Sequence, residues 1–407
     1  MTDYAPYLDW LDSQYERMCG LLMSWCEINS GSGNRAGLET MLASVKKEFQ
    51  GLAGDSEELE LRRYEPLTLF EDASPSLPAR ALRVRKRPSA PLRVLLCCHM
   101  DTVYPPDHPF QHWKKIDDNI LRGPGVTDAK GGIVVMLMAL EAFERSPWSS
   151  NLGWEAFINP DEEIGSPGSA RLLAESAAIS HLGLVFEPCF PNGHLVGERK
   201  GSGNFKLIVR GKAAHAGRDP HLGRNAINAL AWFIVVLNAF ASTESGLTVN
   251  VGCLEGGGPV NVVPDRAECR FNVRAETQRD QRRVEEFLAR VTDGIKLIDG
   301  ISMELRGGFL RPPKVLDSAS RAMLEHVIQC GRDLGLSLEQ HPGGGACDGN
   351  NFAAAGLPVL DSLGVRGADI HSPREHVFLD SLLERAKLAA LLLMKLADGE
   401  ITLPDRS

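Results

Sequence analysis

Three apolar runs of strand-like length each lead into side chains that can bind a metal ion or move a proton. The runs are 93–98, 154–158 and 183–186, and the side chains that follow them are His99, Glu162 with Glu163, and Glu187. Helical apolar spacing at 130–145 and 168–177 alternates with these runs. This alternation favours an α/β fold with a mostly parallel central sheet flanked by helices. Open sheets of this kind bind ligands at the carboxyl ends of their strands, so we expect the chemistry there.

The middle of the chain follows a different order of elements. Strands are expected at 204–210, 247–254, 266–274 and 302–306, with helices at 225–240 and 277–292. This β-α-β-β-α-β order is ferredoxin-like and forms a known compact unit. We therefore predict an inserted domain at 201–312 within a catalytic domain made of residues 1–200 and 313–407. Further helices are expected at 8–30, 36–50, 317–335 and 380–397, with a strand near 358–361.

The composition argues against several classes of partner and compartment. The 407 residues carry a net charge of −9, which opposes nucleic acid or an anionic membrane as the main partner. The longest apolar runs, 133–140 and 230–237, are too short to span a bilayer, and the first residues show no secretory signal. The 9 cysteines form no CxxC pair, so we expect reduced thiols in a cytoplasmic protein.

His99 and Asp101 stand two residues apart at a strand end, so their side chains point the same way. The imidazole can bind a metal while the carboxylate behind it fixes the ring tautomer. A chance histidine is the alternative. Asp128 stands at a helix start between glycines and is either an N-cap or a carboxylate that bridges two cations.

The adjacent carboxylates Glu162 and Glu163 follow a strand, where paired acids rarely serve packing. One can bind a metal while its neighbour takes a proton from water, and a solvated acidic turn is the alternative. Glu187 is a single acid at a strand end. Near the C-terminus, His371 is preferred as a ligand to His376 because it directly follows an apolar residue and precedes a turn.

These elements together resemble one family. The motifs are His99-x-Asp101, Gly125-x-x-Asp128-x-Lys130-Gly131-Gly132, Asp161-Glu162-Glu163-x-Gly165-Ser166, Glu187-Pro188 and Gly211-Lys212-Ala213-Ala214-His215-Ala216-Gly217. They resemble the co-catalytic zinc aminoacylase/carboxypeptidase family, which includes glutamate carboxypeptidase, acetylornithine deacetylase and succinyl-diaminopimelate desuccinylase. The resemblance runs in order from about residue 15 to the C-terminus. Phe186-Glu187-Pro188, Asn261-x-x-Pro264 and the loop 343–345 favour the glutamate carboxypeptidase branch.

The resemblance implies two zinc ions per chain, with cobalt or manganese as other candidates. Asp128 would bridge the ions, His99 and Glu187 would complete one site, and Glu163 and His371 the other. Glu162 would be the general base and Asp101 would orient His99. The resemblance also implies a cis peptide bond between Asp128 and Ala129.

In the inserted domain, the resemblance implies a homodimer in which His215 reaches across to stabilise the oxyanion of the reaction, assisted by Asn261. These donors reach the metals only if domains or chains close together, which predicts a lid with hinges near residues 200 and 312. Arg311 is either the grip for a substrate carboxylate or a surface residue of the hinge, and Arg274 is the other candidate.

The glycine loop before Asp348 offers a further substrate contact, because backbone N–H groups at Gly344 and Gly345 can cradle a carboxylate. Relatives often carry threonine where this chain has Cys347, which affects hydrogen bonding in the loop.

We therefore predict a metallohydrolase that cleaves an amide bond next to a free carboxylate, in N-acyl amino acids or at the C-terminus of short peptides. A biosynthetic deacylase of the acetylornithine or succinyl-diaminopimelate type is the alternative among enzymes. A non-catalytic binding protein on the same fold is the alternative outside them, and such a protein is expected to lack a ligand or the base. A nucleotide site is disfavoured because Gly201-x-Gly203 lacks the third glycine.

Overall fold

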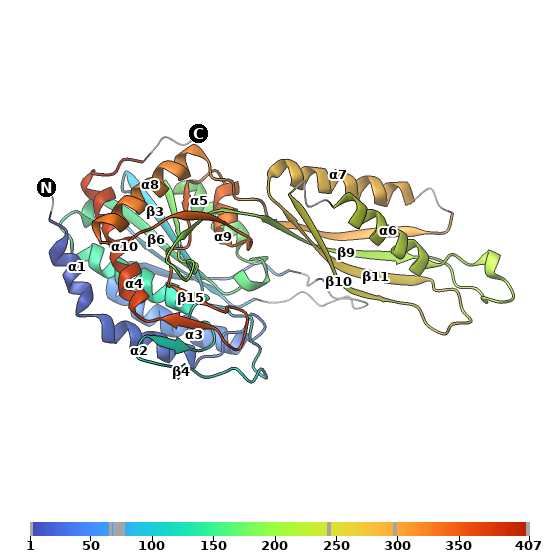
Figure 1. Ribbon diagram of the computed structural model, residues 1–407, viewed down its shortest axis with the longest axis horizontal. Coiled ribbons are helices and arrows are strands. Elements are labelled where there is room, and N and C mark those ends of the chain that lie inside the picture. The colour runs from blue at the N-terminus through green and yellow to red at the C-terminus, as the bar shows by residue number, and fades with distance from the viewer. Residues whose placement is uncertain (1–2, 65–66, 68–77, 242–245, 296–298, 404–407) are drawn as a thin grey trace.

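The computed structural model describes residues 3–64, 67, 78–241, 246–295 and 299–403. Figure 1 shows a larger unit on the left and a smaller, elongated unit on the right. The larger unit contains a six-stranded sheet and the smaller unit a four-stranded sheet. Within the described ranges, no helix combines the length and apolar character that crossing a membrane requires.

The six-stranded sheet confirms the predicted α/β architecture. In spatial order its strands are β1 (Asp55–Leu59), β2 (Ala81–Lys86), β6 (Leu152–Asn159), β3 (Leu92–His99), β7 (Leu182–Val185) and β14 (Val359–Leu360). The pairs from β6 to β14 are parallel, and β1 and β2 pair antiparallel at one edge. β6 is buried along its whole length, as expected for a strand with both faces covered.

Helices cover this sheet. They are α1 (Ala5–Asp12), α2 (Tyr15–Cys26), α3 (Arg35–Phe49), α4 (Lys130–Arg145), α5 (Ala170–Ile179), α8 (Ser318–Asp333), α9 (Asp348–Ala354) and α10 (Asp380–Asp398), with short turns η1 (Gln50–Leu52), η2 (Ser149–Asn151) and η3 (Glu162–Ile164). Almost every residue of α4 is buried, because α4 lies between β3 and the helices α2 and α10. The prediction of one helix over 8–30 is wrong. The backbone N–H and hydroxyl of Ser13 both donate to the Trp10 carbonyl, which ends α1.

Several short strands have no counterpart in the predictions. One small sheet contains β15 (Gly367–Ala368), β16 (His376–Phe378), β5 (Ile120–Arg122) and β4 (Lys114–Lys115), and another pairs β13 (Gln340–Gly343) with β8 (Leu195–Arg199). They are two to five residues long and mostly lack an apolar run, so no periodicity indicates them.

The smaller unit has the predicted β-α-β-β-α-β order. Its elements are β9 (Gly201–Arg210), η4 (Pro220–Leu222), α6 (Ala226–Phe240), β10 (Leu247–Gly256), β11 (Arg266–Ala275), α7 (Gln278–Ile295) and β12 (Ser302–Arg311). Both helices lie on one face of an antiparallel sheet of order β10-β11-β9-β12, as Figure 1 shows, and share an apolar core with it. The domain boundaries at 200 and 312 stay a prediction.

The strand predicted at 302–306 is longer than expected, because β12 continues to Arg311. Gly307 permits this continuation. Its φ is 92°, and a Cβ there would lie 2.2 Å from the Asn204 carbonyl oxygen of the neighbouring strand.

Candidate metal centre

The five predicted metal ligands lie around one edge of the central sheet. His99 is the last residue of β3, η3 with Glu163 follows β6, and Glu187 comes two residues after β7. These three strands are parallel neighbours, so their carboxyl ends meet at the same edge. Asp128 precedes α4, and His371 lies between β15 and β16.

The ligands form two groups of three that share Asp128. In the first group, His99 Nε2 lies 3.1 Å from Asp128 Oδ1 and 3.7 Å from Glu187 Oε1. In the second, His371 Nε2 lies 3.3 Å from Asp128 Oδ2 and 3.0 Å from Glu163 Oε2. Each oxygen of Asp128 therefore faces a different histidine, which is the arrangement of a bridging carboxylate.

These distances fit divalent cations. Histidine nitrogen and carboxylate oxygen are common zinc ligands, and metal–ligand bonds of about 2.1 Å in a tetrahedron place the donors roughly 3.4 Å apart. The donor separations in the two groups are close to that value. The choice of His371 over His376 agrees with this geometry, since the His376 ring packs beside Phe378 and joins neither group.

Asp101 lies behind His99 and ties two strand ends together. His99 Nδ1 lies 3.3 Å from Asp101 Oδ1 and 3.0 Å from the Asp101 carbonyl oxygen. The same carboxylate accepts the backbone N–H groups of Glu162 and Glu163, each at 3.1 Å, and the Ser32 hydroxyl at 2.7 Å. The carboxylate therefore fixes both the His99 ring and the turn that carries the paired acids.

Burial and mutual repulsion control the ionisation of these carboxylates. Burial raises the pKa of Glu163 to about 8 and that of Glu187 well above its ordinary value. Burial opposes ionisation of Asp128 as well, but contacts with His371 and His99 outweigh it and hold its pKa well below the ordinary value. The contact with Asp128, then that with Glu163, raises the pKa of His371 to about 11. A cation in each group would offset this excess of buried negative charge.

His371 is held in an unusual backbone conformation at an open position. Its φ is 59°, a value that side-chain-bearing residues rarely adopt and that clusters at functional sites. Its side chain is 51% exposed, whereas that of His99 is buried. The centre therefore opens to solvent on the side of the second group.

Glu162 forms a buried ion pair that the sequence analysis did not foresee. Its Oε1 lies 2.6 Å from Arg311 Nη1, and both side chains are buried. Arg311 Nη2 also donates to the Glu162 carbonyl oxygen at 2.8 Å and to Ser166 Oγ at 2.9 Å, and it pairs with Asp348 Oδ1 at 3.4 Å. Burial raises the pKa of Glu162 to about 7, with Arg311 opposing the rise. The interpretation of Arg311 as a surface residue of a hinge is therefore wrong.

Glu375 is a site residue that sequence reasoning missed. Its buried carboxylate accepts the backbone N–H groups of Gly125, Thr127 and Asp128 at 3.0–3.1 Å, and the Tyr104 hydroxyl at 3.0 Å. It therefore holds the loop that presents Asp128, where the implied cis peptide bond before Ala129 is present. Glu375 follows a polar turn, not an apolar strand, so no pattern indicated it.

His215 and Asn261 lie side by side in the smaller unit, where the Ala216 N–H donates to the Asn261 carbonyl at 2.8 Å. His215 Nδ1 accepts the N–H groups of Gly217 and Arg218, so the neutral ring carries its proton on Nε2. Both residues are exposed. Figure 1 shows the segment between β9 and α6 at the far right, remote from the central sheet. Within one chain, the structure does not bring these donors to the metal ligands.

The remaining predicted substrate contacts are separate from one another. Gly344 and Gly345 are exposed at the end of β13. Cys347 is buried, and its thiol accepts the Gly349 N–H at 3.3 Å as the N-cap of α9. Arg274 donates from Nε to Asn272 within the smaller unit. None of these contacts tests substrate binding, which stays a prediction.

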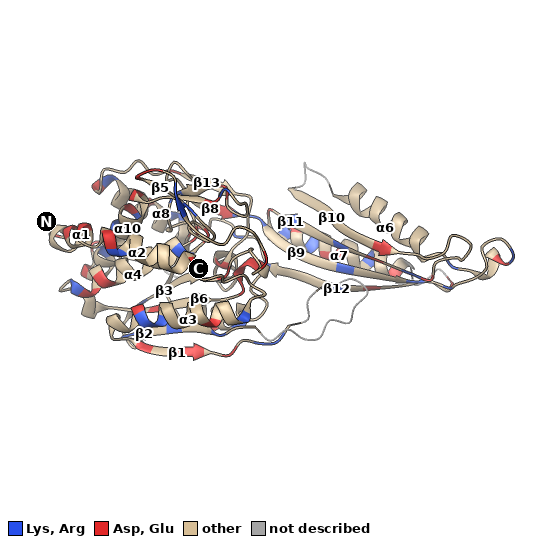
Figure 2. Cartoon of the chain, turned by 90° about the horizontal axis from the view of Figure 1, so that it is seen from below, with Lys and Arg blue, Asp and Glu red and all other residues tan. Residues whose placement is uncertain are grey.

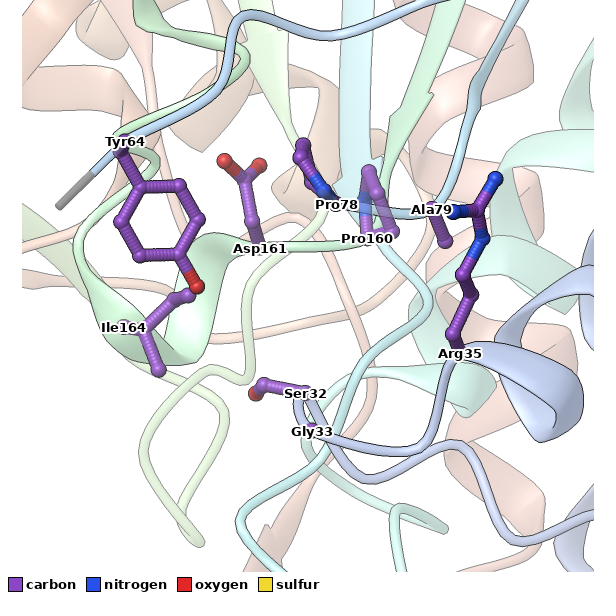
Figure 3. Close-up of a pocket in the computed structure, with 9 residues that line it drawn as sticks. All are labelled: Ser32, Gly33, Arg35, Tyr64, Pro78, Ala79, Pro160, Asp161 and Ile164. Carbon is purple, nitrogen blue, oxygen red and sulfur yellow. The ribbon is translucent and has the colours of Figure 1, made fainter. Parts of the chain in front are cut away.

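A small cavity of about 170 Å³ lies beside the turn that carries Glu162 (Figure 3). Ser32, Tyr64, Asp161 and Ile164 contribute to its walls. The lining residues include none of the five metal ligands, so we assign no substrate to this cavity.

Comparison with known proteins places this geometry in a family. Residues 95–395 match the model described as peptidase family M20/M25/M40. Carboxypeptidase G2 from Pseudomonas sp. (strain RS-16) is 28% identical over 312 residues, which cover 75% of this chain and 74% of that protein. Succinyl-diaminopimelate desuccinylase from Pseudomonas fluorescens is 31% identical over 310 residues, covering 70% of this chain and 77% of that protein.

Among solved structures, an M20 family metallo-carboxypeptidase from Sulfolobus solfataricus superposes with a TM-score of 0.72 at 17% identity, covering 93% of this chain and 98% of the other. At this identity the likeness supports the fold alone. The family match, in contrast, spans most of the chain and contains all five ligands and Glu162. The chain belongs to peptidase family M20/M25/M40, a family of metallohydrolases.

Proposed function

We propose that this metallohydrolase cleaves an amide bond next to a free carboxylate, at the C-terminus of short peptides or in N-acyl amino acids. The observation that carries the proposal is the pair of ligand groups that share Asp128, with the carboxylate of Glu162 on the adjacent turn. A non-catalytic protein on this fold would be expected to lack part of this set, and here the set is complete.

We propose that the two groups hold two zinc ions, with cobalt or manganese as ions that the same donors accept. The first group is His99, Asp128 and Glu187, and the second is Asp128, Glu163 and His371. When bound, the ions polarise the scissile carbonyl and make the attacking water more acidic. The hydrogen bonds that the carboxylates of Asp101 and Glu375 accept fix the segments that carry the ligands before any ion binds.

Glu162 acts as the general base in this proposal. Arg311 occupies one oxygen of its carboxylate, which leaves the other oxygen to take a proton from water and to return it to the leaving amine. Arg311 thereby orients the base. Its Nη atoms are engaged with protein acceptors, so a bidentate grip on a substrate carboxylate would have to displace them. We therefore favour orientation of Glu162 over binding of a substrate carboxylate as the role of Arg311.

A homodimer would bring the remote donors to the centre. α6 contains no charged residue, which Figure 2 shows, and Trp232 and Val235 on its outer face are exposed. On neighbouring β10, Leu254 is exposed as well. An apolar surface of this kind favours pairing with a second copy. His215 of one chain would then donate from Nε2 to the developing oxyanion in its partner.

Mixing two inactive variants tests this shared site. His215→Ala and Glu162→Gln dimers, unfolded together and refolded, should regain activity, because each mixed dimer contains one site with both intact residues. If mixing restores nothing while the mixed dimers are shown to form, His215 does not act across the interface. A sedimentation experiment that finds only monomers would contradict the dimer directly.

The amino acid that is released as the free amine must be identified by experiment. Both carboxypeptidase G2 and succinyl-diaminopimelate desuccinylase are relatives, so a carboxypeptidase and a biosynthetic deacylase are both supported. Amine release should be measured from peptidyl and N-acyl amino acids that carry glutamate, arginine or aliphatic leaving residues. Zinc-loaded protein should release amine and chelated protein should not. Failure of zinc-loaded protein across the whole panel would refute the proposed substrate class.

We also propose the cytoplasm as the compartment, because all nine cysteines are free thiols and most of them are buried.

A further inference from the structure

A third set of metal-binding side chains lies apart from the centre, on the small sheet formed by β8 and β13. His194 directly precedes β8, Glu339 directly precedes β13, and His341 is the second residue of β13. The parallel pairing of the two strands places Gln340 opposite Leu195, so the three side chains gather at one end of the sheet. One donor atom of each lies within 4.8 Å of the other two.

Both imidazoles converge on one carboxylate oxygen. Glu339 Oε2 lies 3.6 Å from His194 Nδ1 and 3.7 Å from His341 Nε2. These separations are too long for hydrogen bonds. They are close to the roughly 3.4 Å expected between two donors on one tetrahedral zinc ion. The centroids of the two rings lie 5.1 Å apart, so both imidazoles stand at the same side of Glu339.

His194 supplies an independent observation. Its Nδ1 is buried from solvent, yet it has no hydrogen-bond partner within the described part of the chain. A buried nitrogen without a partner is unfavourable, and natural proteins rarely leave one unless an ion or water occupies the space beside it. The nitrogen faces Glu339, where the third donor, His341, also points.

We propose that His194, Glu339 and His341 bind a third divalent transition-metal ion, with zinc as the expected occupant. Two histidines and one carboxylate match zinc chemistry and leave a fourth position for water. The side chains of Glu339 and His341 are half exposed or more, so an ion reaches the site from solvent. The site shares no residue with the catalytic centre and does not depend on the proposed reaction.

The bound ion would link β13 to β8, and we expect this link to stabilise the folded chain. β8 is separated by one residue from β9, which enters the smaller unit. β13 leads into the loop whose Ala346 carbonyl accepts a hydrogen bond from Arg311. Because an ion that binds only the folded state stabilises it, zinc should raise the unfolding temperature through this site.

The test compares zinc binding by the wild-type chain, His341→Ala, and the control His221→Ala, whose exposed histidine lies in η4 of the smaller unit. Equilibrium dialysis over increasing free zinc, with bound metal counted by atomic absorption, should show one zinc fewer per chain in His341→Ala alone. Circular dichroism of the metal-free proteins checks that each variant is folded. Equal stoichiometry and affinity in all three proteins would overturn the proposal.

Two further measurements locate the ion. Glu339→Gln should weaken the same binding step at least tenfold while preserving the shape of the side chain. Crystals soaked in zinc should give an anomalous peak between His194 and His341. Zinc bound elsewhere, with this position empty in those crystals, would equally overturn the proposal.

Discussion

Replacing Arg311 with alanine should lower the unfolding free energy of the larger unit by about 3 kcal/mol. The guanidinium is buried and pairs with Glu162 Oε1 at 2.6 Å and Asp348 Oδ1 at 3.4 Å, and it also bonds the Ala346 carbonyl and Ser166. Removing one partner of a buried pair costs about 3–5 kcal/mol, because the other charge stays buried without compensation. We expect the lower value, since Glu162, with a pKa near 7, can take up a proton instead.

Two further substitutions distinguish the contribution of the buried ion pair to stability from the effect of removing any arginine side chain. Arg311→Lys keeps the charge but has fewer donors and no planar fork, so we expect roughly half of the alanine loss. Arg171→Ala removes an exposed pair with Glu175, whose side chains are 78% and 51% exposed. Such surface pairs contribute about 0.5 kcal/mol or less.

The assay is urea unfolding of metal-free protein followed by tryptophan fluorescence. Trp10, Trp25, Trp113, Trp148 and Trp154 belong to the larger unit and only Trp232 to the smaller one, so the signal reports the correct part. Because Glu162 is ionised above pH 7, the loss for Arg311→Ala should be greater at pH 8 than at pH 6. A loss below about 1 kcal/mol at pH 8, with an unchanged denaturant slope, would refute the reasoning.

Three other predictions concern the centre. Glu162→Gln should reduce kcat by about 10²–10⁴-fold while the zinc content stays at the wild-type value, and near-normal turnover would remove Glu162 as the base. Glu375→Gln should weaken zinc binding about 10–100-fold in equilibrium dialysis, because an amide cannot accept all the N–H groups that fix Asp128, and unchanged affinity would contradict that role. Zinc binding should release protons below pH 8, since burial raises the pKa of Glu163 from 4.5 to about 8 and the ion requires the ionised form. Apparent zinc affinity should therefore rise with pH through 8 and above, because His371, whose pKa is raised to about 11, must also lose a proton to bind the ion. Calorimetric heats that do not depend on the buffer would show this to be wrong.

The sequence predicted the parts of the fold that depend on apolar periodicity. β3, β6 and β7 are mostly apolar because both faces of the central sheet are covered, and α4 is mostly apolar because it is almost entirely buried. β1 was not foreseen, because the segment Asp55–Leu59 is mostly polar and exposed. Its place at the sheet edge is set by pairing with β2, which no local pattern reveals.

The candidate site likewise combines features that local sequence patterns predict with contacts that they do not. The shared location of His99, Glu163 and Glu187 was predictable because each follows a strand that the sequence identifies, and parallel strands bring their carboxyl ends together. Glu375 and the Arg311–Glu162 pair were not, because their partners lie 247 and 149 residues away along the chain. Contacts at such separation depend on the tertiary structure, and periodicity contains no information about that.

Hydrogen bonds near residues 200 and 312 indicate where a lid would bend. Asn350 is buried and donates from one amide group to the carbonyls of Lys200 and Pro312, which lie at the two predicted domain boundaries. Arg199 and Lys314 exchange two backbone hydrogen bonds, each of 3.0 Å, just beside these points. The larger unit therefore holds both connections. With Arg311 also fixed to Glu162, we infer that any bending occurs beyond them, toward β9 and Gly307, where motion leaves the Glu162 side chain in place.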